Sequence, residues 1–145
     1  MKIVRVRSYK NIPHYKERGI NSRTTGYHEP RTDTIYVISG KTPQSDIEHE
    51  IYHSKKRHPD KPRNPVNYVK HELEADLYAY RRTGSPKHIK GTLRGILYAI
   101  HSELYKVNAR RAISIIRSVL YNLNVPSSWR DDFKGLCSEV ERMGK

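Results

Sequence analysis

One stretch, SDIEHEIYHSKKRHPD at residues 45–60, constrains the fold of this chain most because it predicts a helix with two marked ends. A capping box of Ser45 and Glu48 would begin the helix. Three cations at positions 55–57 would complement the negative end of its dipole, and the proline that follows would stop it. The sequence therefore predicts a helix at about 46–57.

Two histidines lie four positions apart on this predicted helix, with a glutamate directly after the first. Residues four apart lie on one face of an α-helix, one turn from each other. His49 and His53 can therefore direct their imidazoles at one point, and Glu50 would lie beside them, able to hold a water molecule. A catalytic zinc ion requires such nitrogen ligands, an open position and a nearby carboxylate that is not a ligand. The alternative is an accident of composition, expected in roughly a few per cent of such chains.

A second helix is predicted at about 65–82. Asn64 offers an N-cap, the proline after it suits the first helical position, and Gly84 follows the expected end. Its apolar stripe is formed by Val66, Val69, Leu73 and Tyr80.

Helical phase sorts the possible third ligands on this second helix. Asp76 falls within or beside the apolar stripe and Glu72 at its margin, whereas Glu74 and His71 point to the other side. An acid in an apolar stripe is costly unless it is partnered, so Asp76 requires a hydrogen bond and Glu72 a cation or a metal ion. His58 follows His53 by five residues, which rotates it off the ligand face.

These arguments assign a complete candidate site. The metal ligands are His49, His53 and Glu72, the general base is Glu50, and Asp76 orients a ligand histidine. Glu74 is the alternative ligand. For Glu72 and Glu74 the competing interpretation is a solvated helix face with pairs between residues four apart.

The remaining segments predict an α+β fold. A half-buried strand is expected at residues 2–9, and a β-hairpin with strands near 24–29 and 34–39 around the turn PRTD. We expect a small antiparallel sheet packed on the two metal-binding helices. Two further helices would meet near Asn108, although no glycine or proline there forbids one long helix, and a short last helix would run to about residue 143.

We expect residues 1–86 to form the core and residues 87–145 a helical extension packed on it, or both to form one domain. The extension could complete the core, cover a cleft as a lid, or bind nucleic acid through NARRAISIIRSVL. Apolar periodicity explains most letters of that segment, which favours the first role.

The chain carries 28 Lys and Arg against 15 Asp and Glu, a formal charge of +13. Such a surface attracts nucleic acid, anionic membranes or acidic proteins, but the basic residues are scattered, so a solubilising surface is an equal alternative. The single cysteine, Cys137, excludes an internal disulfide. No apolar run approaches a membrane span or a leader segment, so we expect a cytoplasmic protein without membrane contact; the sequence does not indicate its oligomeric state.

Taken together, the motifs resemble those of gluzincin-type zinc metallopeptidases, in particular the minimal intracellular members akin to the ImmA/IrrE (minigluzincin) group. The hairpin GYHEPRTDTIYVI, the helix SDIEHEIYH and the segment ELEADLYAY occur in that order. The family's second motif is Glu-x-x-Ala-(Asp or Asn) with its first Glu on zinc, and it corresponds here to residues 72–76. The resemblance covers about residues 24–82. Tyr52 stands where the family usually has glycine.

The resemblance implies a zincin-like fold that holds one zinc ion per chain and hydrolyses peptide bonds of an intracellular protein. Glu50 would move the proton, and Tyr68, Tyr78 and His71 are candidate oxyanion donors. The strand at 34–38 would be the edge strand that pairs with an extended substrate. The alternative is a basic nucleic-acid-binding or regulatory protein on the same scaffold, with a structural, latent or lost zinc site.

Overall fold

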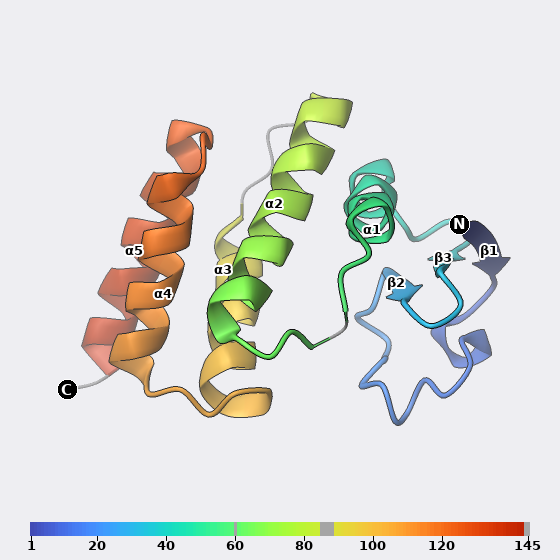
Figure 1. Cartoon of the computed structure of the whole chain (residues 1–145), viewed down its shortest axis with the longest axis horizontal. Helices are drawn as coiled ribbons and strands as arrows, with labels where there is room; N and C mark the ends of the chain where they lie inside the picture. Colours follow the sequence, from blue (N-terminus) through green and yellow to red (C-terminus); the bar gives the residue numbers. More distant parts are fainter. Residues whose placement is uncertain (60, 85–88, 144–145) are drawn as a thin grey trace. The chain divides into compact units, whose positions relative to one another are not determined.

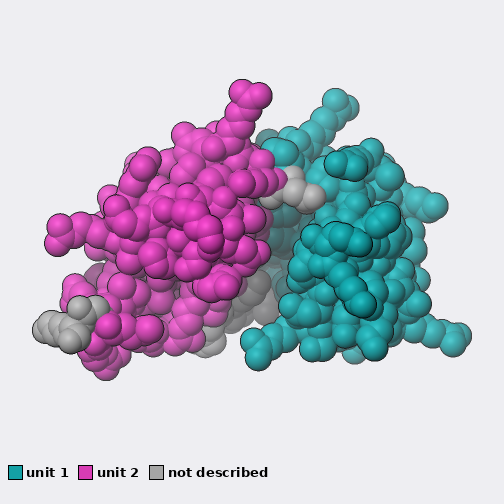
Figure 2. All heavy atoms as spheres, turned by 90° about the horizontal axis from the view of Figure 1, so that it is seen from below, with its two compact units in different colours: residues 1–60, 75–85 teal, residues 61–74, 86–145 magenta. Residues whose placement is uncertain are grey.

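The computed structural model describes residues 1–59, 61–84 and 89–143. The chain divides into two compact units, shown in separate colours in Figure 2. Unit 1 comprises residues 1–60 and 75–85, and unit 2 comprises residues 61–74 and 86–145. The described residues form a small three-stranded sheet and five α-helices, which confirms the α+β class.

The sheet of unit 1 contains the predicted hairpin. Strands β2 (Gly26–Glu29) and β3 (Thr34–Ile38) pair antiparallel, and the Asp33 N–H closes their turn on the Pro30 carbonyl at 3.4 Å. Strand β1 (Lys2–Val6) pairs with the other side of β3, so the strand order is β1-β3-β2 (Figure 1).

Two expectations about the sheet are wrong. The sheet is mixed rather than antiparallel, because β1 and β3 run parallel. Residues 7–25 carry the chain from β1 to the far edge of the sheet, and the hairpin then returns β3 between the two outer strands. Strand β3 is therefore central, with hydrogen-bonded neighbours on both sides, and it cannot be the edge that accepts a substrate strand.

Helix α1 (Gln44–Lys56) confirms the helix predicted at about 46–57 but not its capping box. The chain enters the helix at Pro43, whose carbonyl accepts the first helical hydrogen bonds, and no side chain caps this end. Ser45 consequently lies inside the first turn. Glu48 is engaged elsewhere, because its carboxylate lies 3.7 Å from Arg82 and is only 11% exposed.

The turn of the hairpin is tied to the last turns of α1 through Asp33. The Ser54 hydroxyl donates to the Asp33 carboxylate at 2.6 Å, and His28 Nε2 lies 3.0 Å from the same oxygen. These hydrogen bonds, that of Ser54 first, lower the pKa of Asp33 below its ordinary value. The hairpin thus holds the C-terminal end of the helix that carries both histidines.

Helix α2 (Pro65–Thr83) begins and ends as the sequence predicts. The Asn64 side chain accepts the Val66 N–H at 2.8 Å, and Gly84, with φ +67°, donates its N–H to the Tyr80 carbonyl. Leu73, like Val69, is fully buried, but Val66 is 39% exposed, so the first member of the predicted stripe is wrong.

Unit 2 buries its own core among its last helices. Helix α3 (Lys90–Tyr98) continues into the π-helical segment η2 (Ala99–Glu103), and α4 (Ala109–Asn122) begins where the Asn108 side chain accepts the Arg111 N–H at 2.8 Å. Two separate helices therefore meet near Asn108. With α5 (Ser127–Met143) they bury Leu93, Ile100, Ile116, Leu120, Trp129, Phe133 and Leu136.

No helix within the described ranges is long and apolar enough to cross a membrane. The expected boundary between a core at 1–86 and an extension at 87–145 stays a prediction.

Replacing Asp33 by asparagine should lower the free energy of unfolding at pH 7, because Ser54 and His28 lose a charged acceptor. Asparagine also tolerates the left-handed backbone at this position, where φ is +48°. A carboxyl group whose pKa is lowered by folding stabilises above its unfolded pKa of about 3.9 and loses that contribution as the pH falls further. The difference between wild type and Asp33→Asn in urea unfolding with chelator present should therefore shrink between pH 7 and pH 3.

The exposed residue Glu17 provides the control, since Glu17→Gln removes one acid 73% exposed to solvent. A destabilisation by Asp33→Asn that is the same at both pH values would show that ionisation of Asp33 is not its cause.

Candidate metal centre

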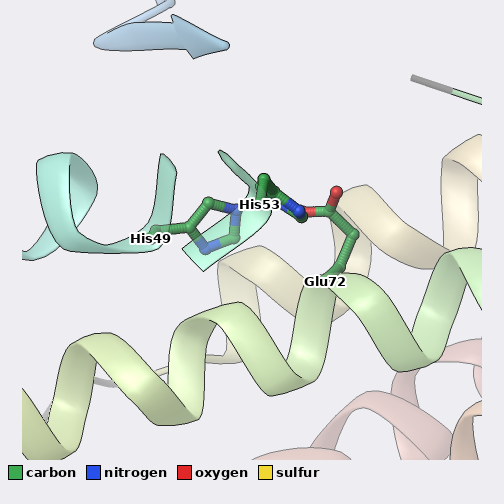
Figure 3. Close-up of side chains that lie close together, drawn as sticks. All are labelled: His49, His53 and Glu72. Carbon is green, nitrogen blue, oxygen red and sulfur yellow. Dashed lines mark hydrogen bonds between the residues drawn. The ribbon is translucent and has the colours of Figure 1, made fainter. Parts of the chain in front are cut away.

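Helix α1 directs its two histidines at one point. The Nε2 atoms of His49 and His53 lie 3.0 Å apart, and their rings meet edge to face with centroids separated by 4.6 Å. Glu72 of α2 points its carboxylate toward His53 (Figure 3). One ligand atom from each of the three side chains lies within 4.8 Å of the others. The three residues proposed as ligands are therefore grouped as metal binding requires.

The donor set fits a divalent transition metal. A tetrahedral zinc ion with bonds of about 2.0–2.1 Å separates two ligand atoms by about 3.3 Å, close to the observed 3.0 Å between the imidazole nitrogens. Two imidazoles and one carboxylate are also the ligands of several catalytic zinc sites, which leave the fourth position to water. The donor types do not fix the identity of the metal.

The buried carboxylate of Asp76 contacts Nδ1 of His49, the ring nitrogen that does not face His53. Asp76 Oδ1 lies 2.7 Å from His49 Nδ1, and Asp76 is 2% exposed. A carboxylate accepts only, so His49 carries a proton on Nδ1 and presents Nε2 toward the group. The contact agrees with the partner predicted for Asp76, and its role in orienting a metal ligand stays a prediction.

His58 contacts Nδ1 of His53, the ring nitrogen that does not face His49. The sequence did not predict this contact. The two Nδ1 atoms lie 3.0 Å apart, whereas Nε2 of His53 faces His49. Arg57 adopts the left-handed conformation, with φ +53°, and the His58 N–H then donates to the His53 carbonyl at 3.0 Å. This is a Schellman helix end, in which the second residue beyond the cap folds back onto the last turn. The contact could not be predicted from helical periodicity, because that argument assumes that the helix continues through residue 58.

The neighbouring acids occupy different environments. Glu50 follows His49 on α1 and is half-buried, and its role as a base stays a prediction. Glu74, the alternative ligand, lies 3.9 Å from Lys70 one turn away and does not belong to the three-residue group. The alternative interpretation, a solvated helix face with pairs between residues four apart, therefore describes Glu74 better than it describes Glu72.

Two of the candidate oxyanion donors have defined surroundings. Burial, and then the negative charge of Glu72, raise the pKa of Tyr68, so its hydroxyl stays protonated and able to donate at neutral pH. The Tyr78 hydroxyl accepts from Lys55 Nζ at 3.0 Å. His71 is half-buried on α2. None of the three roles is established by these contacts.

Tyr52 lies on α1 directly before His53 and is half-buried. Its ring centroid lies 5.2 Å from that of Tyr78 and 5.6 Å from that of His58. The bulky residue at this position is thus accommodated by aromatic packing with α2 and with the end of α1, and it removes none of the three ligands.

No protein-family model, curated protein or solved structure matches this chain. The resemblance to gluzincins therefore rests on the quoted motifs alone and stays a prediction. The grouping of His49, His53 and Glu72 is an independent observation, because it comes from the geometry of the chain.

Substituting Glu72 by glutamine should weaken zinc binding by at least about tenfold, or about 1.4 kcal/mol, because the amide lacks the charge of the carboxylate. Competition with a chromophoric chelator measures this affinity, and elemental analysis gives the stoichiometry, expected to be one zinc per wild-type chain. Glu74→Gln, two residues away on α2, is the matched control and should bind as wild type does. Equal affinities for the two variants would exclude Glu72 as a ligand.

Proposed function

We propose that this protein is a zinc-dependent metallopeptidase that hydrolyses peptide bonds of an intracellular protein. The observation that carries the proposal is the grouping of two imidazoles and one carboxylate within 4.8 Å, with Glu50 adjacent to a ligand on the same helix. Structural zinc sites have four protein ligands, whereas three ligands and a neighbouring acid are typical of hydrolytic sites.

The chemistry divides between the ion and the side chains. Bound zinc would polarise the scissile carbonyl and lower the pKa of a coordinated water. Glu50 would accept the proton of the attacking water and deliver it to the departing amine. Asp76 and His58 would keep the two imidazoles oriented with Nε2 toward the ion.

Tyr68 is the oxyanion donor that the surroundings favour. It precedes Glu72 by one helical turn, so both side chains lie on the same face of α2. A phenol with an ordinary pKa of about 10 is already protonated at neutral pH, so Tyr68 could donate to a developing oxyanion. The Tyr78 hydroxyl accepts a hydrogen bond from Lys55, which leaves its own proton able to donate, so Tyr78 stays the second candidate.

The substrate would have to meet the sheet at an outer strand. Strand addition requires an outer strand, and in the described sheet the outer strands are β1 and β2 because β3 is central. Strand β2 packs on α1, the helix of the two histidines, and is the better placed of the two.

A basic nucleic-acid-binding or regulatory protein remains the second hypothesis, on the strength of the +13 charge. Lys and Arg are spread over both units rather than gathered in one element. Binding that falls steeply as salt rises, with no peptide cleavage by the zinc-loaded chain, would favour this hypothesis.

Glu50→Gln should retain stoichiometric zinc and lose cleavage by about 10²–10⁴-fold, because the amide cannot accept the proton. The assay combines elemental analysis with mass-spectrometric detection of fragments from a mixture of unfolded proteins. Glu17→Gln, at an exposed position of unit 1, should leave both measurements unchanged. Undiminished cleavage by Glu50→Gln would exclude its role as base, and zinc-loaded wild type that cleaves nothing in the mixture would count against the peptidase.

A further inference from the structure

Helix α4 carries three arginines and no acidic residue, and two of the three face a groove in unit 2. The groove has a volume of about 620 Å³ and lies between α4 and α5, which pack on each other (Figure 1). Arg110, Ser114 and Arg117 line its α4 side. We propose that this groove binds the phosphates of a single-stranded nucleic acid. The proposal does not depend on the metal centre or on the proposed peptidase.

Helical spacing places exposed polar side chains of α4 in one row. The row consists of Arg110, Ser114, Arg117 and Tyr121. Successive members are three or four residues apart, so they lie on one face of the helix. The row extends over about 16 Å along the helix axis. It is therefore long enough to contact more than one phosphate of an extended strand.

The positive charges along this row are not neutralised by the protein. Among the described residues, Arg110, Arg117 and Arg130 form no ion pair with a carboxylate. Arg94 of α3 shows the contrast, because two of its nitrogens bind the Glu139 carboxylate at 2.8 and 3.1 Å. Unpaired cations attract a polyanion, and the counterions released from its phosphates favour binding.

Aromatic rings hold two of these guanidinium groups in place. Arg117 Cζ lies 5.6 Å from the ring centroid of the buried Phe133, and Arg130 Cζ lies 5.0 Å from that of Tyr121. Both distances are typical of cation–π contacts. A guanidinium that is already oriented loses less conformational freedom when it binds a phosphate. The packing of α4 on α5 thus prepares the two arginines for an anion.

Tyr121 favours a single strand among the possible polyanions. Its side chain is 44% exposed and continues the row of arginines. Proteins that bind single strands combine a positively charged groove with aromatic side chains on which unpaired bases stack. A helix that binds a membrane surface instead buries an apolar face in the lipid. The apolar face of α4, which includes Ile116 and Leu120, is already buried in the core of unit 2.

The first test measures the affinity of the full chain for a fluorescently labelled 12-nucleotide single-stranded DNA by anisotropy, at several salt concentrations. Arg110→Gln and Arg117→Gln should each weaken binding about fivefold at 0.1 M salt and reduce the slope of log K against log salt by about 0.7, because each removes one phosphate contact. Arg111→Gln is the matched control. Arg111 is exposed on the same helix but does not line the groove, so its loss should change neither quantity.

The second test examines the aromatic and acidic members of the surface with the same oligonucleotide. Tyr121→Leu should weaken binding by about 5–100-fold because a base loses its stacking partner, whereas Tyr121→Phe should bind as wild type does. Glu141 is an exposed acid that lines the groove, so Glu141→Gln should strengthen binding. A duplex of the same sequence should bind more weakly than the single strand, because its bases are already stacked.

Three results would overturn the proposal. Equal losses in Arg110→Gln and Arg111→Gln would reduce the interaction to net charge, and a duplex bound as tightly as the single strand would exclude recognition of unpaired bases. Wild type that ignores the oligonucleotide but binds vesicles containing phosphatidylserine would assign the groove to a membrane. Zinc affinity and peptide cleavage should be unchanged in Arg117→Gln, so failure of this proposal is distinguishable from failure of the peptidase.

Discussion

The hydrogen bond between Asp76 and His49 is the interaction on which the candidate site depends. A carboxylate that is 2% exposed is costly to bury without a partner, and His49 supplies that partner at 2.7 Å. The bond joins α2 to α1 one helical turn from Glu72, which lies on the same face of α2 as Asp76. One face of α2 therefore carries both the partner of His49 and the third member of the candidate ligand group.

Local signals in the sequence are enough to predict the helices and the grouping of the three candidate ligands. Asn64 and Gly84 mark the ends of α2, and the phase of its apolar stripe separates Glu72 from Glu74. The direction of β1 could not be predicted in this way, because it depends on the course of residues 7–25 and on pairing between distant segments. His58 was missed because a left-handed turn at a non-glycine residue, Arg57, has no clear sequence signal. The capping box failed because the chain enters α1 earlier, at Pro43.

The candidate site contains several acidic residues, whereas the chain as a whole carries an excess of positive charge. The protein carries a formal charge of +13, yet Glu50, Glu72 and Asp76 occur on or beside the two ligand turns. Like charges in such proximity repel one another unless a cation or a proton intervenes. A divalent ion on the two imidazoles and Glu72 would provide that compensation.

The end of α1 has a consequence for how this helix tolerates substitution. The His58 N–H reaches the His53 carbonyl because Arg57 adopts the left-handed conformation. Glycine adopts that conformation without steric cost, whereas a β-branched side chain is strained there. A residue that belongs to no candidate ligand group therefore decides whether the rings of His53 and His58 stay in contact.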